Sequence, residues 1–218
     1  MSDDGDGANS GPLDVASNGA YAKNIPLFCG KQHLELLFGN AAGTSVRTFG
    51  IDRQGCETGG LRFTLTWGAG ANDLEAHLII EGGRINNPDG GTGDCTWTSC
   101  LPGLTPLPWG TQFGAAGAPQ KDVDWMEDRG VENIYLTKPE PKKYHLYVEY
   151  WATGTPTTAT ATLNFFGKTQ VLTHANFTSR QVWDVGVIDG AAKTFAPSDA
   201  TIDCTADWSG GCRRPLPQ

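Results

Sequence analysis

The stretch LTWGAGANDLEAHLII, residues 65–80, carries the pattern that decides the fold. Gly68-Ala69-Gly70 interrupts a first apolar run, and a second strand pattern begins at Asp73. Side chains of a strand alternate between its two faces, so the second run separates into an apolar face and a polar face. The apolar face holds Leu74, Ala76, Leu78 and Ile80, and the polar face holds Asp73, Glu75 and His77. The pattern predicts two strands that each turn one face toward a core.

Similar strand patterns recur along the chain. They are LRFTLTW (61–67), NIYL (133–136), YHLYVEYW (144–151) and QVWDVGVID (181–189). TTATATLNFFG and TQVLTH predict a hairpin around Gly167-Lys168. Short strands separated by Gly/Pro turns predict an all-β antiparallel sandwich, Ig-like or jelly-roll-like. The short run LELLF (34–38) fits a helical turn as well as a strand.

Composition points to the same class and restricts the partners. The 218 residues include 29 Gly and 13 Pro, which favour turns between strands. The formal net charge is −8 and no basic stripe is visible, so we expect no nucleic-acid partner. No apolar run reaches the ~18 residues of a membrane-spanning helix, so we expect no transmembrane segment.

Six cysteines, at positions 29, 56, 95, 100, 204 and 212, predict disulfides and an oxidising compartment. A preference for short loops favours Cys95–Cys100 and Cys204–Cys212, which leaves Cys29–Cys56. Zinc is disfavoured because no CxxC motif is present. The chain is therefore expected to be extracellular, periplasmic or tethered to the cell surface by a lipid.

The predicted organisation has three parts. Residues 1–20 are acidic and glycine-rich, which predicts a flexible leader like those that follow a removed export signal or a lipid anchor. Residues 21–190 form one sandwich domain with an N-terminal extension over 21–60. Within it, residues 81–121 form a long loop that the Cys95–Cys100 bridge pins. Residues 191–218 are expected to be an irregular, disulfide-pinned tail.

A second acidic run, DVDWMEDRGVENI (122–134), makes a cation site worth considering. Oxygen ligands suit Ca²⁺, whereas an imidazole suits transition metals and would here orient a carboxylate. The alternative is a solvated strand face with acidic turn residues, and the residues themselves leave it open. The candidate metal ligands are Asp73, Glu75, His77, Asp122, Asp124, Asp128 and Glu132.

Tryptophans near the long loop or on an outward strand face form a second candidate site. Exposed aromatic rings stack on sugars and peptides, while the alternative is core packing or loop anchoring. The candidate ligand-binding residues are Trp97, Trp109, Trp125 and Trp151.

Signals for catalysis are weak, and whether the chain is an enzyme stays open. Glu75 with Asp124 or Glu149 would form a carboxylate pair of the kind that glycosidases use. No G-x-S-x-G, H-E-x-x-H or phosphate-loop motif is present.

The order LTW, DLEAHL, DVDWMEDRGVENI and PKKYHLYVEYW resembles the YfaP-like exported bacterial β-sandwich domains over residues 61–190. In this resemblance Asp73, Glu75 and His77 occupy the positions of a D-x-D-x-H strand in that family. Trp125 stands where the family has a further Asp. The chain is more distantly similar to bacterial pre-peptidase C-terminal domains, some of which bind calcium and some a polymer.

The expected function is a secreted or surface-tethered, non-catalytic binding or adhesion module with calcium as a stabilising ion. Its partner would be a polysaccharide or an extracellular protein. Two alternatives stay open: a polysaccharide hydrolase or lyase that uses the carboxylate pair, and a structural component of an extracellular assembly.

Overall fold

A computed structural model divides the chain into two compact units, one made of residues 12–58 and one that contains residues 59–218. The expected leader, Cys29 and Cys56 lie outside the residues that the structure describes. The described residues are 30–40, 43–53, 60–70, 73–86, 93–101, 103–109, 118–121, 124–126, 130–207 and 211–212.

The smaller unit contains a hairpin of two antiparallel strands, β1 (Gly30–Asn40) and β2 (Gly43–Arg53). The run LELLF therefore lies in a strand, with Leu37 paired to Val46. An apolar run this short has no period of its own, and pairing with a second strand decides its conformation.

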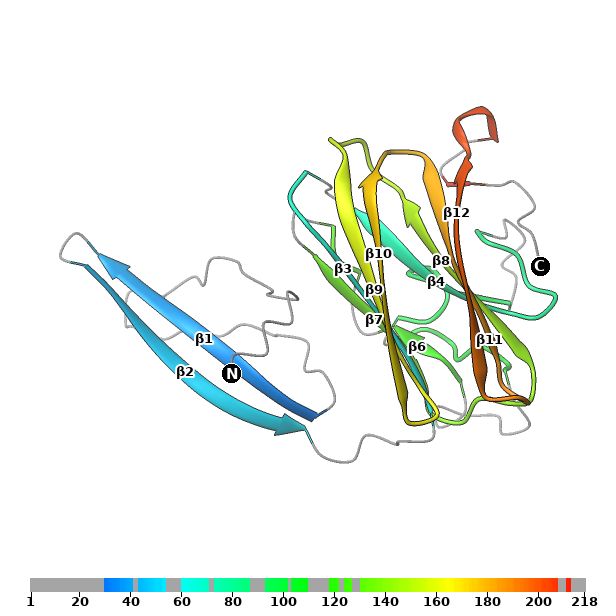
Figure 1. Ribbon diagram of the computed structural model, residues 1–218, viewed down its shortest axis with the longest axis horizontal. Coiled ribbons are helices and arrows are strands. Elements are labelled where there is room, and N and C mark those ends of the chain that lie inside the picture. The colour runs from blue at the N-terminus through cyan, green and yellow to red at the C-terminus, as the bar shows by residue number, and fades with distance from the viewer. Residues whose placement is uncertain are drawn as a thin grey trace. The chain divides into compact units, whose positions relative to one another are not determined.

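The larger unit is an antiparallel β-sandwich of two five-stranded sheets, as the strand patterns predict (Figure 1). Every pair of neighbouring strands in it is antiparallel. The first sheet has the spatial order β10 (Lys168–Phe177), β9 (Thr157–Phe165), β3 (Leu61–Trp67), β7 (Val131–Leu136) and β6 (Gln120–Lys121). The second has the order β12 (Thr194–Asp203), β11 (Gln181–Asp189), β8 (Lys143–Tyr150), β4 (Leu74–Ile80) and β5 (Asp94–Cys95).

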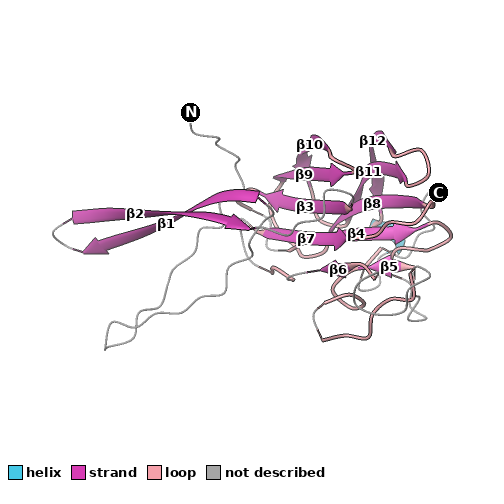
Figure 2. Cartoon of the chain, turned by 90° about the horizontal axis from the view of Figure 1, so that it is seen from below, coloured by secondary structure: helices cyan, strands magenta, loops and turns pink. Residues whose placement is uncertain are grey.

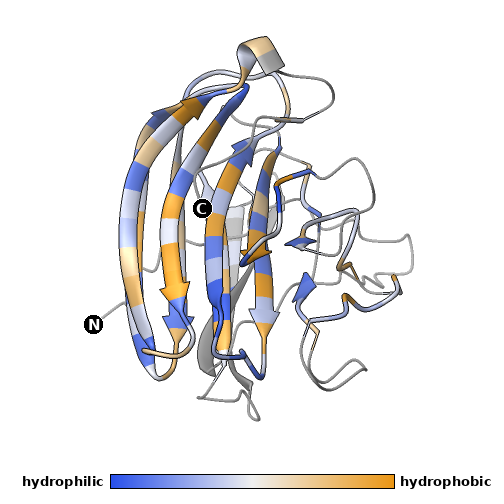
Figure 3. Cartoon of the chain, turned by 90° about the vertical axis from the view of Figure 1, so that its right-hand side faces the viewer, coloured by the Kyte–Doolittle hydropathy of each residue, from blue (hydrophilic) through white to orange (hydrophobic). Residues whose placement is uncertain are grey.

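One apolar core lies between the sheets. Alternating residues of β3, β4, β8 and β9 enter it, among them Phe63, Leu78, Leu146 and Leu163, all fully buried. Orange and blue residues alternate along several of these strands in Figure 3, which is the two-residue period that the sequence shows. The predicted hairpin between β9 and β10 is present, and its turn contains Gly167 at φ +77°.

The C-terminal region corrects one expectation, because Thr194–Asp203 forms strand β12 instead of an irregular tail. Pro197 lies within this strand, and proline has no N–H group to donate to a neighbouring strand. Among the described strands, β12 pairs with β11 and lies at the edge of its sheet, and an edge strand tolerates a residue without an N–H group. Pro197 pairs with Gly186, beside a bulge in β11.

Side chains link the two edge strands β10 and β12 across one side of the sandwich. His174 Nδ1 lies 3.1 Å from Asp199 Oδ1, and His174 Nε2 lies 3.1 Å from Thr201 Oγ1. The opposite sheet edges are β5 and β6, which have two residues each and lie near one another in Figure 2. The candidate site lies on this second side.

Two of the expected disulfides, Cys95–Cys100 and Cys204–Cys212, are present. The first closes the loop after β5, and the second closes the segment that follows β12. No helix in the described part of the chain has the length and apolar character needed to cross a membrane.

Candidate cation site and buried ion network

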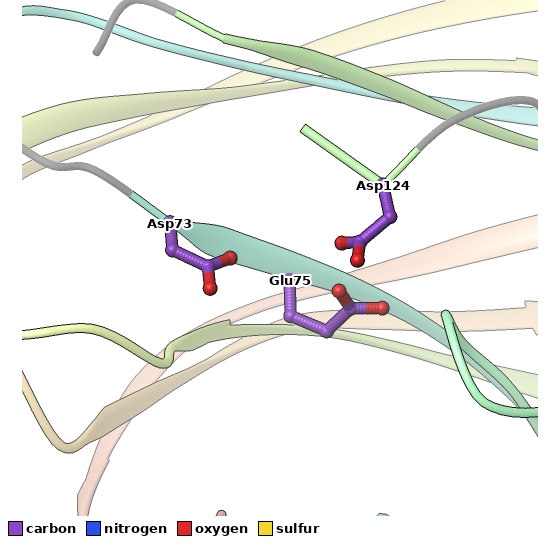
Figure 4. A group of neighbouring side chains, drawn as sticks. All are labelled: Asp73, Glu75 and Asp124. Carbon is purple, nitrogen blue, oxygen red and sulfur yellow. The ribbon is translucent and has the colours of Figure 1, made fainter. Parts of the chain in front are cut away.

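Three carboxylates converge at the start of β4. Asp73 directly precedes the strand, Glu75 is its second residue, and Asp124 approaches from the segment before β7 (Figure 4). One oxygen from each lies within 4.8 Å of the others. The two-residue strand period places Asp73 and Glu75 on one side, as the sequence predicts. The Asp73 carbonyl accepts a hydrogen bond from the Trp151 N–H at 3.2 Å, which fixes the start of β4 beside β8.

Glu75 is buried, with 1% of its surface exposed, so its face of β4 is not a solvated face. Its Oε1 accepts hydrogen bonds from the Thr96 hydroxyl, from the Trp97 N–H at 3.0 Å and from Lys121 Nζ at 2.5 Å. Three donors on one oxygen hold this carboxylate in a single position.

Lys121 is the central cation of the network and is fully buried. Its Nζ lies 2.5 Å from Glu75 Oε1, 2.9 Å from Glu132 Oε2 and 4.0 Å from Asp124 Oδ1. Because Lys121 and Glu132 belong to the first sheet and Glu75 to the second, these ion pairs join the two sheets.

Glu132 adds two further bonds across this side of the sandwich. Its Oε2 accepts the Ala76 N–H at 2.9 Å, and its Oε1 accepts the Trp125 N–H at 3.2 Å. The first bond satisfies a backbone donor of β4 at a point where β5 does not pair with it. Glu132 therefore serves the ion network and is not one of the three converging ligands.

The acids of this cluster hold more negative charge than Lys121 compensates. Burial, and then the charges of Glu75 and Asp124, raise the pKa of Asp73 to about 7. Burial and Glu75 also raise the pKa of Asp124. Burial and Glu75 raise the pKa of Glu132. A site with raised carboxyl pKa values either holds protons or attracts a further cation.

Burial opposes the charge of Lys121, but Glu132 and Glu75 outweigh it and raise the pKa of the ammonium. Lys121 therefore stays charged. The four carboxylates, when ionised, exceed it by three charges. This excess lies closest to Asp73 and Asp124, which are the two partly exposed acids.

His77 does not join the carboxylate cluster. It is fully buried on the same face of β4, with Nδ1 3.0 Å from Asp94 Oδ2 and Nε2 3.5 Å from Glu149 Oε2. Burial opposes its charge, but Asp94 and Glu149 outweigh it and raise the pKa of His77 to about 10. His77 is thus the cation of a second buried ion network and not a metal ligand.

Glu149 is the main anchor of this second network. Its Oε2 accepts a hydrogen bond from Asn86 Nδ2 at 2.6 Å, and its Oε1 accepts the Cys212 N–H. Asp94 in turn accepts the Asn86 N–H at 2.9 Å. The carboxylate of Glu149 therefore holds two loops onto the sheet.

The remaining candidates have different surroundings. Asp122 and Asp128 lie outside the described residues. Trp109 is buried in the core, with its ring 6.3 Å from that of Tyr144, so it is a packing residue. Trp125 is partly buried against the core. Trp97 and Trp151 pack edge to face, with ring centroids 6.2 Å apart.

Sequence reasoning missed Lys121, Asp94 and Thr96 as parts of the site. All three lie in the long segment 81–121, where no strand period indicates which side chains point inward. One available signal was Lys121 itself, a single cation immediately before the acidic run.

Comparison of the chain with protein-family models, curated proteins and solved structures gives no match.

Proposed function

We propose that the chain is an exported, non-catalytic binding module in which one Ca²⁺ ion, held by Asp73, Glu75 and Asp124, orders the loops beside β4. The observation that carries this proposal is the convergence of three carboxylates within 4.8 Å at one end of the sandwich. Export is part of the proposal and is supported by two disulfides in the described residues. The resemblance of residues 61–190 to YfaP-like exported domains is a second argument for export.

The donor set favours calcium over transition metals. All three groups are carboxylates, which are hard oxygen ligands, and His77 is occupied by Asp94 and Glu149. Asp124 comes from a loop and Asp73 from a strand end, and Ca²⁺ accepts irregular geometry of this kind. A divalent ion would also offset the negative charge that Lys121 leaves uncompensated.

Calorimetric titration of chelator-treated protein tests the calcium site. We expect heat of binding at one ion per chain, and a higher melting temperature in excess Ca²⁺. At a free ion concentration of 100 times Kd, the stabilisation is about 2.7 kcal/mol. Asp73→Asn/Asp124→Asn should abolish both signals, and Glu81→Gln, at an exposed acid outside the cluster, should keep both. No heat and no melting shift at millimolar Ca²⁺ would refute the site.

A polysaccharide hydrolase or lyase is the second candidate, favoured by the raised pKa of Asp73, about 7, beside Glu75. A group that titrates near neutral pH is suited to general acid catalysis. A screen for new reducing ends on a polysaccharide panel would detect the hydrolase, and absorbance of an unsaturated product would detect the lyase. Activity that Asp73→Asn abolishes would replace the binding role with a catalytic one.

A further inference from the structure

The loop after β5 presents an exposed tryptophan on a tightly fixed backbone. Cys95, Thr96 and Cys100 are buried, whereas Trp97 between them has 38% of its surface exposed. The exposed part of the Trp97 indole leaves apolar surface in water, and a ligand that covers this surface would gain the corresponding hydrophobic free energy.

Several bonds lock this loop independently of the indole ring. The Cys95–Cys100 disulfide closes it, and the Ser99 and Cys100 N–H groups both donate to the Thr96 carbonyl at 3.1 Å. The Ser99 hydroxyl donates to the Asp94 carbonyl at 2.5 Å and accepts the Thr96 N–H at 3.0 Å. A ligand that meets Trp97 therefore does not have to order the loop, which lowers the entropic cost of binding.

The ring itself has a defined orientation next to the carboxylate cluster. Trp151 packs against it at an interplanar angle of 78°. The Trp97 N–H donates to Glu75 at 3.0 Å, and the Trp151 N–H donates to the Asp73 carbonyl at 3.2 Å. The backbones of both tryptophans are thus bonded to the strand end that carries Asp73 and Glu75.

We propose that Trp97 and the neighbouring carboxylates Asp73 and Asp124 form a binding site for a neutral polysaccharide, with a sugar ring stacked on the Trp97 indole. A sugar offers an apolar face of C–H groups to an aromatic ring and hydroxyl donors at its rim, and this site provides a partner for each. In the ion-free site, ionised Asp73 and Asp124 would repel uronate and sulfated polymers, so a neutral polymer fits this state better. The inference rests on the proposed binding role and names its ligand class, but it does not require the cation.

Affinity electrophoresis of the full chain through gels that contain mixed-linkage β-glucan, galactomannan or xylan tests this site. In the presence of chelator, we expect at least one of these neutral polymers to retard the wild-type protein, and polygalacturonate to leave it unretarded. Trp97→Ala should weaken binding about tenfold or more, which corresponds to roughly 1.4 kcal/mol. Trp97→Phe should keep part of the affinity because it keeps an aromatic ring.

Val171→Ala is the matched control, since it removes an exposed apolar side chain from β10, on the other sheet. It should be retarded like wild type, and all variants should melt at nearly the same temperature. Failure of every neutral polymer to retard the wild type, or equal retardation of Trp97→Ala, overturns the inference.

Calcium titration separates this inference from the proposed cation site. Binding of Ca²⁺ without retardation by any polymer refutes the polysaccharide site alone. Trp97-dependent retardation that persists in chelator, with no heat from Ca²⁺, supports the polysaccharide site and refutes the cation site alone.

Discussion

The outer faces of β9 in the first sheet and of β4 and β8 in the second come from similar alternating sequences but have opposite surroundings. On β9, Thr158 and Asn164 are exposed beside buried Ala159 and Leu163. On β4 both faces are buried, and the outward residues Glu75 and His77 have at most 1% exposure. Alternation therefore tells which face meets the core, but it does not tell whether the other face meets water.

Burial of the charged outer residues of β4 costs free energy, and ion pairs offset this cost. A buried charge needs a partner and satisfied hydrogen bonds, because desolvation penalises it by several kcal/mol. Lys121 and His77 supply these partners for Glu75, Glu132, Asp94 and Glu149. The outer residues of β9 are threonine and asparagine, which need no such partner in water.

Among the proposed substitutions, Lys121→Met is expected to cause the largest loss of stability at the buried outer face of β4. The substitution leaves Glu75 and Glu132 buried without a counter-ion, so we expect the free energy of unfolding to fall by about 3–5 kcal/mol. Denaturant titration at pH 7 measures it. Lys138→Met, at an exposed lysine, should change it by less than about 0.5 kcal/mol.

Restoring charge balance sharpens this test. Glu75→Gln/Lys121→Met/Glu132→Gln removes the whole ion group and should recover much of the stability that Lys121→Met loses, since uncompensated charge causes the loss. Equal stability of Lys121→Met and Lys138→Met would contradict the proposed role of Lys121.

His77 makes the stability of the buried outer face of β4 sensitive to alkaline pH. Its folded pKa of about 10 exceeds the ordinary value of 6.5, so its stabilising contribution is complete below pH 6.5 and is lost as pH rises through about 10. The loss amounts to at most about 1.4 kcal/mol per pH unit in this window. Unfolding free energy measured across it should fall more steeply for wild type than for His77→Gln. Parallel curves would show that His77 is not protonated in the folded state.

The same substitution at two threonines compares the faces most directly. Thr96 is buried and donates to Glu75, so Thr96→Val should cost about 1.5–3 kcal/mol, the range for a hydrogen bond to a charged group. Thr158→Val on the exposed face of β9 should change stability by less than about 0.5 kcal/mol. Denaturation midpoints of the two variants provide the measurement, and similar values would mean that the faces do not differ in this way.

Strand patterns predict most of the sandwich, because each strand face that meets the core leaves a two-residue period in the sequence. β3, β8 and β9 follow it directly, whereas β11 departs from it at the bulge between Asp184 and Gly186. β12 leaves no such period because most of its residues are exposed, and its Pro197 is compatible with a strand at a sheet edge. Edge position depends on which strands pair, and local sequence does not reveal pairing.

For the candidate site, the sequence predicts the three converging acids but not what surrounds them. Asp73, Glu75 and Asp124 come from the two acidic runs that the strand period and the resemblance single out. His77 and Glu132 share those runs but belong to ion networks, because Asp94 and Lys121 reach them from segments without periodic pattern. Burial of Glu75 depends on the loops after β4, whose path a residue period cannot predict.

The edges of the sandwich bear on how the protein behaves at high concentration. A long, flat edge strand invites pairing with another copy, which leads to aggregation. Within residues 60–212, β5 and β6 are too short to serve as such a template. β10 carries a bulge between His174 and Phe177, and β12 carries Pro197. The His174 contact with Asp199 further links β10 to β12. We therefore expect neither side of the sandwich to pair readily, edge to edge, with another copy.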